Sequence, residues 1–382
     1  MLILNNDDIR SVLDMDTVIS ALRGSYQELI ENVSVCRPNI STNIPIGRHD
    51  AFFKWSTMEG GSSKSGYFAM RVKNDIWHRT VYGPEAARVV TEEWYSTKPG
   101  KYCGLIFLVN IQNAEIVAIM NDSHIQRSRV GADGGIGADL MANDSSEVLG
   151  VLGSGGMART HVAAMMCVRN INRIQVFSPT KEHREKFVAE LRDAYQVEAE
   201  AMSQPEMVFK GADIVAGCTD GGFLDEEDSA AIVGRWLDGG THVTSIGGAF
   251  DKEAMRRTDV ALRFGNAPAP VGLPEWGVPD EVVCYGVPVG AGTSPGENEF
   301  YVDSLSRRAR GEMIPDKTIY LTDLLSGVVQ GRTDSRQITF SERGNLQGAQ
   351  FHAVASKVYE AALQAGVGRE LPTEWFLQDE RN

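Results

Sequence analysis

Residues 147–158 read Glu147-Val148-Leu149-Gly150-Val151-Leu152-Gly153-Ser154-Gly155-Gly156-Met157-Ala158. The apolar run predicts a buried strand, the glycines predict a tight turn, and the residues after them begin a helix. In such a turn Gly153 permits the sharp bend, Gly155 lets backbone N–H groups approach a phosphate, and Ala158 lets the helix pack close to the strand. The helix N-terminus adds partial positive charge. The stretch therefore favours a dinucleotide-binding turn, with an ordinary structural turn as the alternative.

The segments around this turn fit a βαβ unit. Residues 161–167 suit a helix, and the apolar run 174–177 predicts a second strand at the spacing that a crossover helix requires. Later apolar runs at 212–219 and 242–248 predict further parallel strands. Strands separated by helix-length segments indicate an α/β fold with a doubly wound, Rossmann-type parallel sheet. An α/β domain that binds no nucleotide is the alternative.

Length and composition narrow the class of protein. A chain of 382 residues suits two domains, and no apolar run approaches the ~20 residues that span a bilayer, so we expect a cytoplasmic protein without a membrane partner. The net charge of −14 and the dispersed basic residues argue against nucleic acid. Five scattered cysteines and seven scattered histidines form no metal-ligand motif, so we predict no metal.

The residues before the glycine turn predict a second domain of the α+β class. Helical periodicity begins near Asp7, and apolar runs at 51–55, 66–73, 104–109 and 115–120 predict strands of an antiparallel or mixed sheet. Residues 123–142 predict a connecting helix, although four glycines weaken it, and 351–364 predict a helix that returns to the first domain. We therefore expect a substrate-binding and dimerisation domain from residues 1–125 with 336–382, and a dinucleotide-binding domain from residues 126–335.

Proline and glycine are concentrated between residues 266 and 297. This composition predicts a long loop or a loop-rich excursion. It is either a surface insertion or a lid or subunit contact.

Four stretches carry a family likeness that spans most of the chain. They are the strand Phe68-Ala69-Met70-Arg71-Val72-Lys73, the helix start Arg129-Val130-Gly131-Ala132, the glycine turn, and the run from Gly239 to Gly247 that includes His242. In these stretches the chain resembles the ornithine cyclodeaminase/mu-crystallin family. In that family the strand that corresponds to residues 68–73 carries a lysine, and the helix start that corresponds to residues 129–132 reads Arg-Thr-Ala-Ala. The resemblance implies a nicotinamide cofactor, with Gly247 among its contacts. It also implies a homodimer joined through the amino-terminal domains, a site between the domains, and small amino-acid or imine substrates.

Two stretches depart from the family pattern. Cyclodeaminases carry an aspartate after the Gly-Gly pair, where this chain has Ala249; Asp251 follows two residues later and need not point into the same site. The family's Phe-Lys-Ser-Val-Gly is replaced by the run from Phe340 to Gly348. These departures disfavour ornithine cyclisation and suggest an outlying subfamily with its own substrate.

Basic residues are the candidates for substrate binding and proton transfer. The planar guanidinium of arginine suits a substrate carboxylate, and Arg37, Arg71 and Arg129 are the candidates, with a solvated surface position as the alternative for each. Lys73 leaves the same strand face as Arg71. A partly buried lysine can exchange a proton near neutral pH, so we assign Lys73 as general acid/base. Arg71 is the other candidate, because it can also be aligned with the family lysine.

The cofactor positions follow from the ends of the predicted strands. The turn itself supplies Gly153, Ser154, Gly155, Gly156, Met157 and Ala158. After the second strand come Ser178, Thr180 and Lys181, with Arg184 close behind and no acid for the ribose hydroxyls, so NADP(H) is favoured over NAD(H). A solvated helix start is the alternative. Thr219 and Asp220 follow a later strand and are expected to line the nicotinamide ribose or amide, unless they form an ordinary turn.

Three functions remain open on these residues. The first is an NAD(P)-dependent imine or ketimine reductase or amino-acid dehydrogenase, acting on a small amino acid, its imine or the related 2-oxo acid. The second is a cyclodeaminase-type ammonia lyase, which Ala249 disfavours. The third is a crystallin-like binding protein that holds the cofactor without useful turnover.

Overall fold

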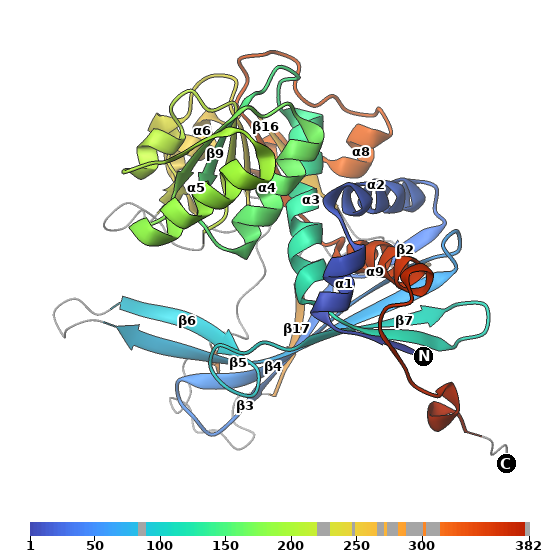
Figure 1. Ribbon diagram of the computed structural model, residues 1–382. Helices are drawn as coiled ribbons and strands as arrows, with labels where there is room; N and C mark the ends of the chain where they lie inside the picture. The colour runs from blue at the N-terminus through green and yellow to red at the C-terminus, as the bar shows by residue number, and fades with distance from the viewer. Residues whose placement is uncertain are drawn as a thin grey trace.

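The chain folds around two β-sheets joined by one central helix. The computed structural model describes residues 1–82, 89–219, 230–246, 249–265, 271–272, 282–287, 301–302 and 314–378. Figure 1 shows the first sheet spread beneath the second, with helix α3 (Ser123–Met141) standing between them. Of the residues singled out by sequence, Asp220 and Gly247 lie outside the described parts, as does most of 266–297.

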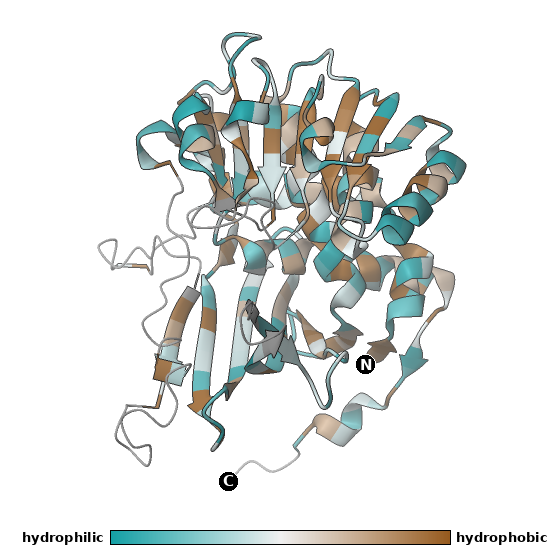
Figure 2. Cartoon of the chain, turned by 90° about the vertical axis from the view of Figure 1, so that its left-hand side faces the viewer, coloured by the Kyte–Doolittle hydropathy of each residue, from teal (hydrophilic) through white to brown (hydrophobic). Residues whose placement is uncertain are grey.

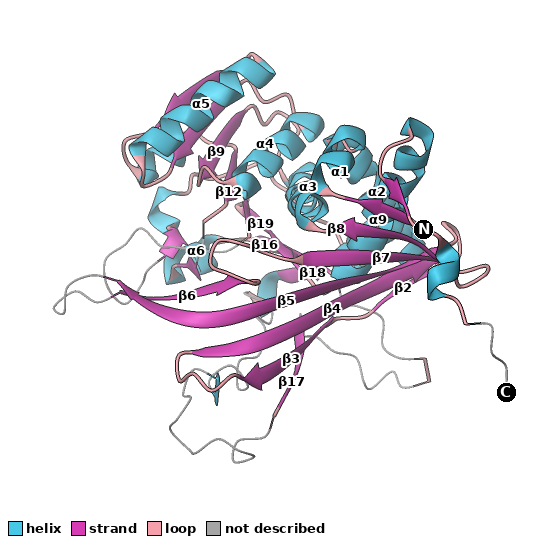
Figure 3. Cartoon of the chain, turned by 60° about the horizontal axis from the view of Figure 1, so that its bottom comes forward, coloured by secondary structure: helices cyan, strands magenta, loops and turns pink. Residues whose placement is uncertain are grey.

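The first sheet has ten strands, which are mainly antiparallel. Its path runs β17-β3-β4-β5-β7-β8-β1-β20, with β2 paired to β4 and β6 paired to β5. Figure 3 shows β3, β4, β5 and β7 side by side as a broad, curved layer. The strands are β1 (Leu2–Leu4), β2 (Ser34–Cys36), β3 (Asn39–Pro45), β4 (Ala51–Ser62), β5 (Tyr67–Tyr82), β6 (Val89–Tyr95), β7 (Gly104–Asn110), β8 (Ile116–Asn121), β17 (Val282–Gly286) and β20 (Arg369–Glu370).

Three helices cover one face of this sheet. They are α1 (Asn6–Val12), α2 (Met15–Ile30) and α9 (Gln347–Ala365). Helix α1 begins with a capping box between Asn5 and Asp8, and α2 begins with the Asp14 carboxylate accepting from the Thr17 amide. Helix α9 packs on β4, β5 and α2, which confirms the predicted return of the carboxy-terminal helix to the first layer.

The second sheet has eight strands, and every strand pair in it is parallel. Its order is β11-β10-β9-β12-β14-β19-β16-β18, which confirms the Rossmann-type α/β prediction. The strands are β9 (Val148–Leu152), β10 (Arg173–Phe177), β11 (Glu198–Ala201), β12 (Ile214–Gly217), β14 (His242–Ser245), β16 (Val260–Phe264), β18 (Thr318–Tyr320) and β19 (Thr339–Arg343). Figure 2 shows hydrophobic residues gathered in these strands and hydrophilic residues on the outer helices, as a sheet buried on both faces requires.

Most of the remaining elements lie around the second sheet, whereas the last 3₁₀ turn, Thr373–Phe376, lies near the first sheet, where Thr373 contacts Met1 and Glu115. The helices are α4 (Gly156–Val168), α5 (Lys181–Tyr195), α6 (Lys252–Arg257) and α8 (Leu321–Leu325); β13 (Ala230–Ile232) pairs with β15 (Ala249–Phe250); and single 3₁₀ turns occupy Pro205–Val208, Gly234–Trp236, Pro315–Lys317 and Thr373–Phe376. None of the described helices is long and apolar enough to cross a membrane.

Helix α3 is continuous despite its four glycines, and its packing explains why. A Cβ at Gly131 would lie 2.5 Å from the carbonyl oxygen of Thr160, and one at Gly135 would lie 2.8 Å from the Cβ of Ala164, both on α4. The glycines therefore let α3 and α4 touch backbone to backbone, and this packing outweighs their weak helix propensity.

Two strands bear on the predicted domain limits. Strand β17 comes from the proline- and glycine-rich segment but pairs in parallel with β3, so part of that segment extends the first sheet. Strand β19 lies inside 336–382 but joins β14 and β16 of the second sheet. The two-domain division stays a prediction, and each of these strands pairs with the sheet of the other predicted domain.

Candidate active site

The glycine turn lies where the strand order of the second sheet reverses. Strand β9 is flanked by β10 on one side and β12 on the other, and ligands of doubly wound sheets bind outside the carboxyl ends of strands at such a point. Gly153 has φ +113°, and a Cβ there would lie 2.5 Å from the carbonyl oxygen of Cys218, directly after β12. The backbone of Thr219 follows at the same edge. Gly153 is therefore required by the fold itself.

The space in front of α4 is open and its N-terminus is uncapped. A Cβ at Gly155 would meet nothing within 4 Å, and no side chain of the described residues caps the helix. The first backbone N–H groups of a helix, here from Gly156 onward, have no intrahelical acceptor and attract anions. Ala158, by contrast, is fully buried. The turn thus fits a pyrophosphate, with Gly155 facing the open side.

The residues after β10 make mostly local contacts. Ser178 accepts a hydrogen bond from the hydroxyl of Ser154 at 3.0 Å, and Arg184 donates to the carbonyl of Ser178 at 2.9 Å. Lys181 is exposed and lies 3.7 Å from Glu185, one turn along α5, and Thr180 precedes that helix without capping it. Ser178 therefore contacts the turn, and Thr180 and Lys181 follow it at the start of α5.

Two arginines that the sequence analysis did not single out border the glycine turn. Arg159 donates to the carbonyl of Ser154 at 2.6 Å and pairs with Glu190. Arg127, near the start of α3, approaches Gly156 so closely that a Cβ there would lie 3.0 Å from its Cδ. Helix α3 thus reaches the phosphate end of the site, and Arg129 lies two residues further along the same helix.

Arg71 is buried on β5 and is held by one carboxylate. Its Nε and Nη2 donate to Oδ2 of Asp122 at 2.8 and 2.5 Å, and its Nη1 faces the sulfur of Met58 at 3.5 Å. The guanidinium lies 4.9 Å from the ring centroid of Phe351. One edge of Arg71 is therefore fixed, whereas Nη1 has only a weak acceptor.

Arg129 is buried against the same aromatic ring as Arg71. Its Nη1 donates to Oε1 of Gln350 at 2.7 Å, its Nη2 donates to Oε1 of Gln126 at 2.8 Å, and its guanidinium lies 5.0 Å from the same Phe351 ring. Burial lowers the pKa of Arg129 to about 10. The side chain stays charged at neutral pH although both hydrogen-bond partners are uncharged amides.

A buried acid lies one helical turn beyond Arg129. Asp133 accepts from the hydroxyl of Tyr26 and, at 2.7 Å, from Nε2 of Gln350. Burial raises the pKa of Asp133 to about 6, although Arg129, both hydrogen bonds and Arg343 act to lower it. Arg343 ends β19 and donates to the carbonyl of Ile246 at 2.9 Å, so the carboxyl edge of the second sheet meets this polar cluster.

Lys73 leaves β5 on the same face as Arg71 but has separate partners. Its Nζ lies 2.8 Å from Oδ2 of Asp75 and 5.4 Å from the ring centroid of Trp94. The lysine side chain is partly exposed and the Asp75 carboxylate is buried. The Asp75 carboxylate is therefore placed to orient the ammonium of Lys73.

Comparison with known proteins identifies one family that part of the chain resembles. The model of the ornithine cyclodeaminase/mu-crystallin family matches residues 95–266, which include the glycine turn and Arg129. In this stretch the chain is similar to that family. A curated relative, an uncharacterized cyclodeaminase of Sinorhizobium fredii, is 21% identical over 371 residues, covering 96% of this chain and 98% of the relative.

Solved structures of family enzymes share the fold. The Δ1-pyrroline-2-carboxylate reductase of Thermococcus litoralis, solved with NADH and L-proline, is 21% identical, covers 97% of this chain and 100% of its own, and has a TM-score of 0.69. An archaeal alanine dehydrogenase dimer with bound NAD is 19% identical, with 97% and 99% coverage and the same TM-score of 0.69.

Arg37 is separated from the other candidate arginines in its contacts. It pairs with Glu59, to which its Nη2 donates at 2.7 Å. Glu59 neighbours Met58 on β4, and alternate residues of a strand leave opposite faces, so its side chain lies across the sheet from the Met58–Arg71 contact. A role for Arg37 in holding substrate stays a prediction.

The acid that family cyclodeaminases carry has no evident replacement among the described residues. Ala249 begins β15, and Asp251 caps α6 by accepting from the Ala254 amide at 2.6 Å and the Gly234 amide at 3.0 Å. Asp251 is therefore occupied in holding local backbone. No group of His, Cys, Asp or Glu within the described ranges is arranged to hold a metal ion.

Sequence reasoning missed much of the polar cluster. Asp122, Asp133 and Arg343 were not singled out, nor were the partners Tyr26 and Gln350. Asp133 was recoverable, because it lies four residues after Arg129 on a predicted helix and such residues are neighbours. Arg343 was harder, because β19 reads Thr339-Phe340-Ser341-Glu342-Arg343 and lacks the apolar run that marks the other parallel strands.

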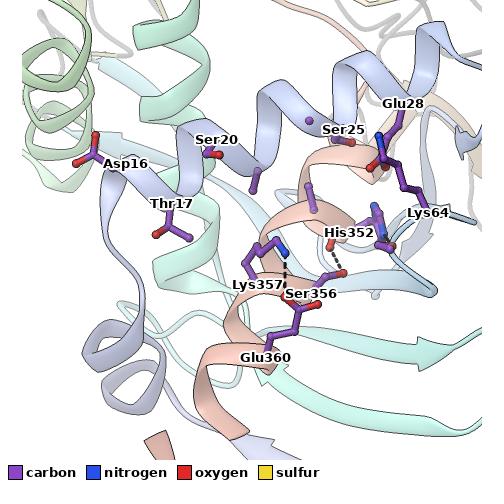
Figure 4. Close-up of a pocket in the computed structure, with 14 residues that line it drawn as sticks. Asp16, Thr17, Ser20, Ser25, Glu28, Lys64, His352, Ser356, Lys357 and Glu360 are labelled. Carbon is purple, nitrogen blue, oxygen red and sulfur yellow. Dashed lines mark hydrogen bonds and ion pairs between the residues drawn. The ribbon is translucent and has the colours of Figure 1, made fainter. Parts of the chain in front are cut away.

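A surface pocket lies away from the arginine cluster and Lys73. Figure 4 shows this pocket between α2 and α9, and it has a volume of about 630 Å³. Its polar lining includes Ser20, Ser25, Lys64 and Ser356, and His352 borders it with Nε2 at 2.7 Å from the Ser65 hydroxyl. None of the residues predicted from sequence lines it, so the chemistry favours the arginine cluster as the site.

Proposed function

We propose that this protein is an NAD(P)-dependent oxidoreductase that acts on the C–N bond of a small amino acid or its imine. The observation that carries the proposal is the pair of buried arginines, Arg71 and Arg129, on one aromatic ring, with Arg129 two residues along α3 from the Arg127 that contacts the glycine turn. The reductase and dehydrogenase among the solved relatives support it. A small carboxylate substrate between the two sheets suits both.

The arginine cluster has the charge to hold a carboxylate. Arg71, Arg129 and Arg343 bring three positive charges, while Asp122 neutralises Arg71 directly and Asp133 is reached from Arg129 only through Gln350. Nη1 of Arg71 is available to a ligand, because its contact with the sulfur of Met58 is a weak hydrogen bond. A carboxylate beside Phe351 would receive charge-assisted hydrogen bonds from fixed donors.

Lys73 is the better candidate for proton transfer. Reduction of an imine consumes one proton as the nitrogen becomes an amine, and the reverse reaction releases it. Arginine cannot act as the donor because its guanidinium stays protonated in proteins. The ammonium of Lys73 can, and Asp75 at 2.8 Å orients it. Arg71 would hold the substrate and Lys73 would exchange the proton.

The nicotinamide cofactor would supply or accept the hydride. The uncapped N-terminus of α4 and the open space at Gly155 would hold its pyrophosphate. We favour NADP(H), because Ser178 and Thr180 follow β10 where NAD enzymes place an acid, and Lys181 and Arg184 are close. The solved relatives carry NADH and NAD, so the two cofactors must be compared directly.

The assembly and domains follow the same reasoning. We propose a homodimer formed through the first domain, supported by the archaeal alanine dehydrogenase, which is described as a dimer. We also keep the division into a substrate-binding domain and a dinucleotide-binding domain. The cofactor would bind on the second sheet and the substrate between the two sheets.

A cyclodeaminase is the second candidate, since one relative carries that name. Ala249 and the capping role of Asp251 count against it.

One assay separates the candidates. We expect oxidation of NADPH, followed by its absorbance, when the protein is given Δ1-pyrroline-2-carboxylate or a 2-oxo acid with ammonia or methylamine. Ammonia release from ornithine without net cofactor change would instead support the cyclodeaminase. Cofactor binding with neither reaction would support a crystallin-like binding protein. A lower Kd for NADH than for NADPH, titrated through tryptophan fluorescence, would overturn the NADP(H) preference.

A further inference from the structure

Among the described residues, no carboxylate contacts the buried cation of Arg129. Its described partners, Gln126 and Gln350, are both neutral. A buried charge without a compensating partner is costly, so the fold must supply countercharge nearby. The nearest acid on the same helix is Asp133, one turn along α3, and it reaches Arg129 through a single side chain.

Gln350 is that connection. Its Oε1 accepts from Arg129, and its Nε2 donates to Oδ2 of Asp133 at 2.7 Å and to the hydroxyl of Tyr26 at 2.9 Å. The Tyr26 hydroxyl donates in turn to Oδ1 of Asp133. The acid and the arginine are thus held at a fixed separation by one amide and one phenol, each from a different helix.

Other charged and titratable groups surround Asp133 on every side. Tyr26 comes from α2, Arg129 from α3, and Arg343 from β19. His161 of α4 and Glu342 of β19 line the same small cavity as Asp133, and burial lowers the pKa of His161 to about 4, so it is neutral near pH 6. Glu342 is paired with Arg263 at 3.2 Å. Asp133 is therefore the acid that compensates the charge of Arg129.

We propose that Asp133 is a positioning residue that, through Gln350 and Tyr26, holds Arg129 in place and sets how tightly the site binds a carboxylate. This inference rests on the proposed function, because it takes the ligand of Arg129 to be a substrate carboxylate. It adds a residue for which the family resemblance supplied no role. The phenol of Tyr26 can donate to the ionised acid and accept from the protonated one, so both states keep the geometry.

The coupling has a definite sign. A bound carboxylate disfavours the ionised form of Asp133, so binding raises the pKa of Asp133 and takes up protons from solution. By reciprocity, protonating Asp133 tightens carboxylate binding. If the bound anion shifts the pKa from about 6 by one unit, affinity is about tenfold higher well below that pKa than well above it, and uptake peaks near half a proton per ligand.

The experiment is calorimetric titration of the NADPH-loaded protein with pyrrole-2-carboxylate, a planar carboxylate, in buffers of different ionisation enthalpy between about pH 5.5 and 8. Pyrrole-2-carboxamide is the uncharged control ligand. We expect proton uptake with the acid and none with the amide. In Asp133→Asn the uptake should vanish and the affinity near pH 8 should rise up to about tenfold, whereas a merely structural role would weaken it.

Two further variants complete the test. Asp139→Asn removes an equal charge from the same helix, where Asp139 pairs with Arg23 and Arg169, and should leave proton uptake unchanged. Tyr26→Phe removes a donor that lowers the pKa of Asp133, so the uptake maximum should move to higher pH. This variant tests the inference even if Asp133→Asn does not fold.

Binding of the acid without proton uptake in the wild type, or uptake that persists in Asp133→Asn, would overturn the role of Asp133. Failure of the NADPH-loaded protein to bind pyrrole-2-carboxylate at any pH would instead count against the proposed function.

Discussion

In the glycine turn one residue is required by the fold, and another is required, on our proposal, by the cofactor. Gly153 has φ +113° and closely approaches the carbonyl of Cys218, whereas Gly155 has φ −85° and faces open space. Replacing each with alanine adds the same methyl group at positions two residues apart. The two variants should therefore fail in different ways.

The magnitude for Gly153→Ala comes from two contributions. A non-glycine residue in an unfavourable backbone region costs about 1–3 kcal/mol. The added Cβ would also lie 2.5 Å from the carbonyl oxygen of Cys218, so the end of β12 must move. Overpacking of this kind adds about 1–3 kcal/mol. We expect Gly153→Ala to lower the free energy of unfolding by about 2–6 kcal/mol in the absence of cofactor.

Gly155→Ala should leave the cofactor-free protein nearly as stable as wild type, because the methyl group meets nothing within 4 Å. It occupies the space of the phosphate, so the Kd for NADPH should rise at least tenfold, about 1.4 kcal/mol. Urea unfolding gives the stability, and tryptophan fluorescence gives the Kd. Unchanged NADPH affinity in Gly155→Ala would refute binding of the pyrophosphate at Gly155. Unchanged stability in Gly153→Ala would refute the argument from backbone strain and overpacking at position 153.

Three other predictions address the arginine cluster, the lysine and the buried histidines. Lys73→Met should lower kcat about 100-fold while NADPH still binds, the effect of removing a general acid/base, and near-normal turnover would exclude Lys73 from proton transfer. Arg71→Ala leaves Asp122 buried without its partner and should cost about 3–5 kcal/mol in urea unfolding, whereas Arg71→Ala with Asp122→Asn should recover part of that loss; equal losses would show that the pair is not coupled. Burial lowers the pKa of His242 to about 3, so between about pH 3 and 6.5 the unfolded chain binds a proton that the native chain does not. For this residue the free energy of unfolding should therefore fall by about 1.4 kcal/mol for each unit by which the pH drops below about 6.5. His242→Asn should flatten that slope, and an unaltered slope would contradict the assignment.

The fold was predictable where residues specify it locally. Short-range patterns of apolar residues and glycine predicted the glycine turn, strands at 174–177 and 242–248 and a returning helix at 351–364, and the structure has these elements at 173–177, 242–245 and 347–365. The edge strand β17 was not predictable, because pairing between Val282–Gly286 and β3 joins segments far apart in sequence and leaves no local pattern. Parallel strand β19 was missed because its buried polar residues pair with other buried groups of the second sheet.

The candidate site was predictable only for residues that belong to a motif. Arg129 and the Arg71/Lys73 pair were named from the family likeness, but which of the two could transfer a proton depended on their partners. Asp122 occupies one edge of Arg71, and Asp75 orients Lys73, and neither contact can be read from spacing alone. The contacts of Arg71 and Lys73 therefore favour Lys73 as the residue that transfers the proton.

Helix α3 explains why the two halves of the site keep a fixed separation. It carries Arg127 against the glycine turn, Arg129 against Phe351, and Asp133 against Tyr26 and Gln350. At 1.5 Å rise per residue these three residues span only about 9 Å along one rigid element. The glycines that weaken this helix in isolation let it pack against α4, so this packing also fixes where the glycine turn lies relative to the arginines that we propose to bind a carboxylate.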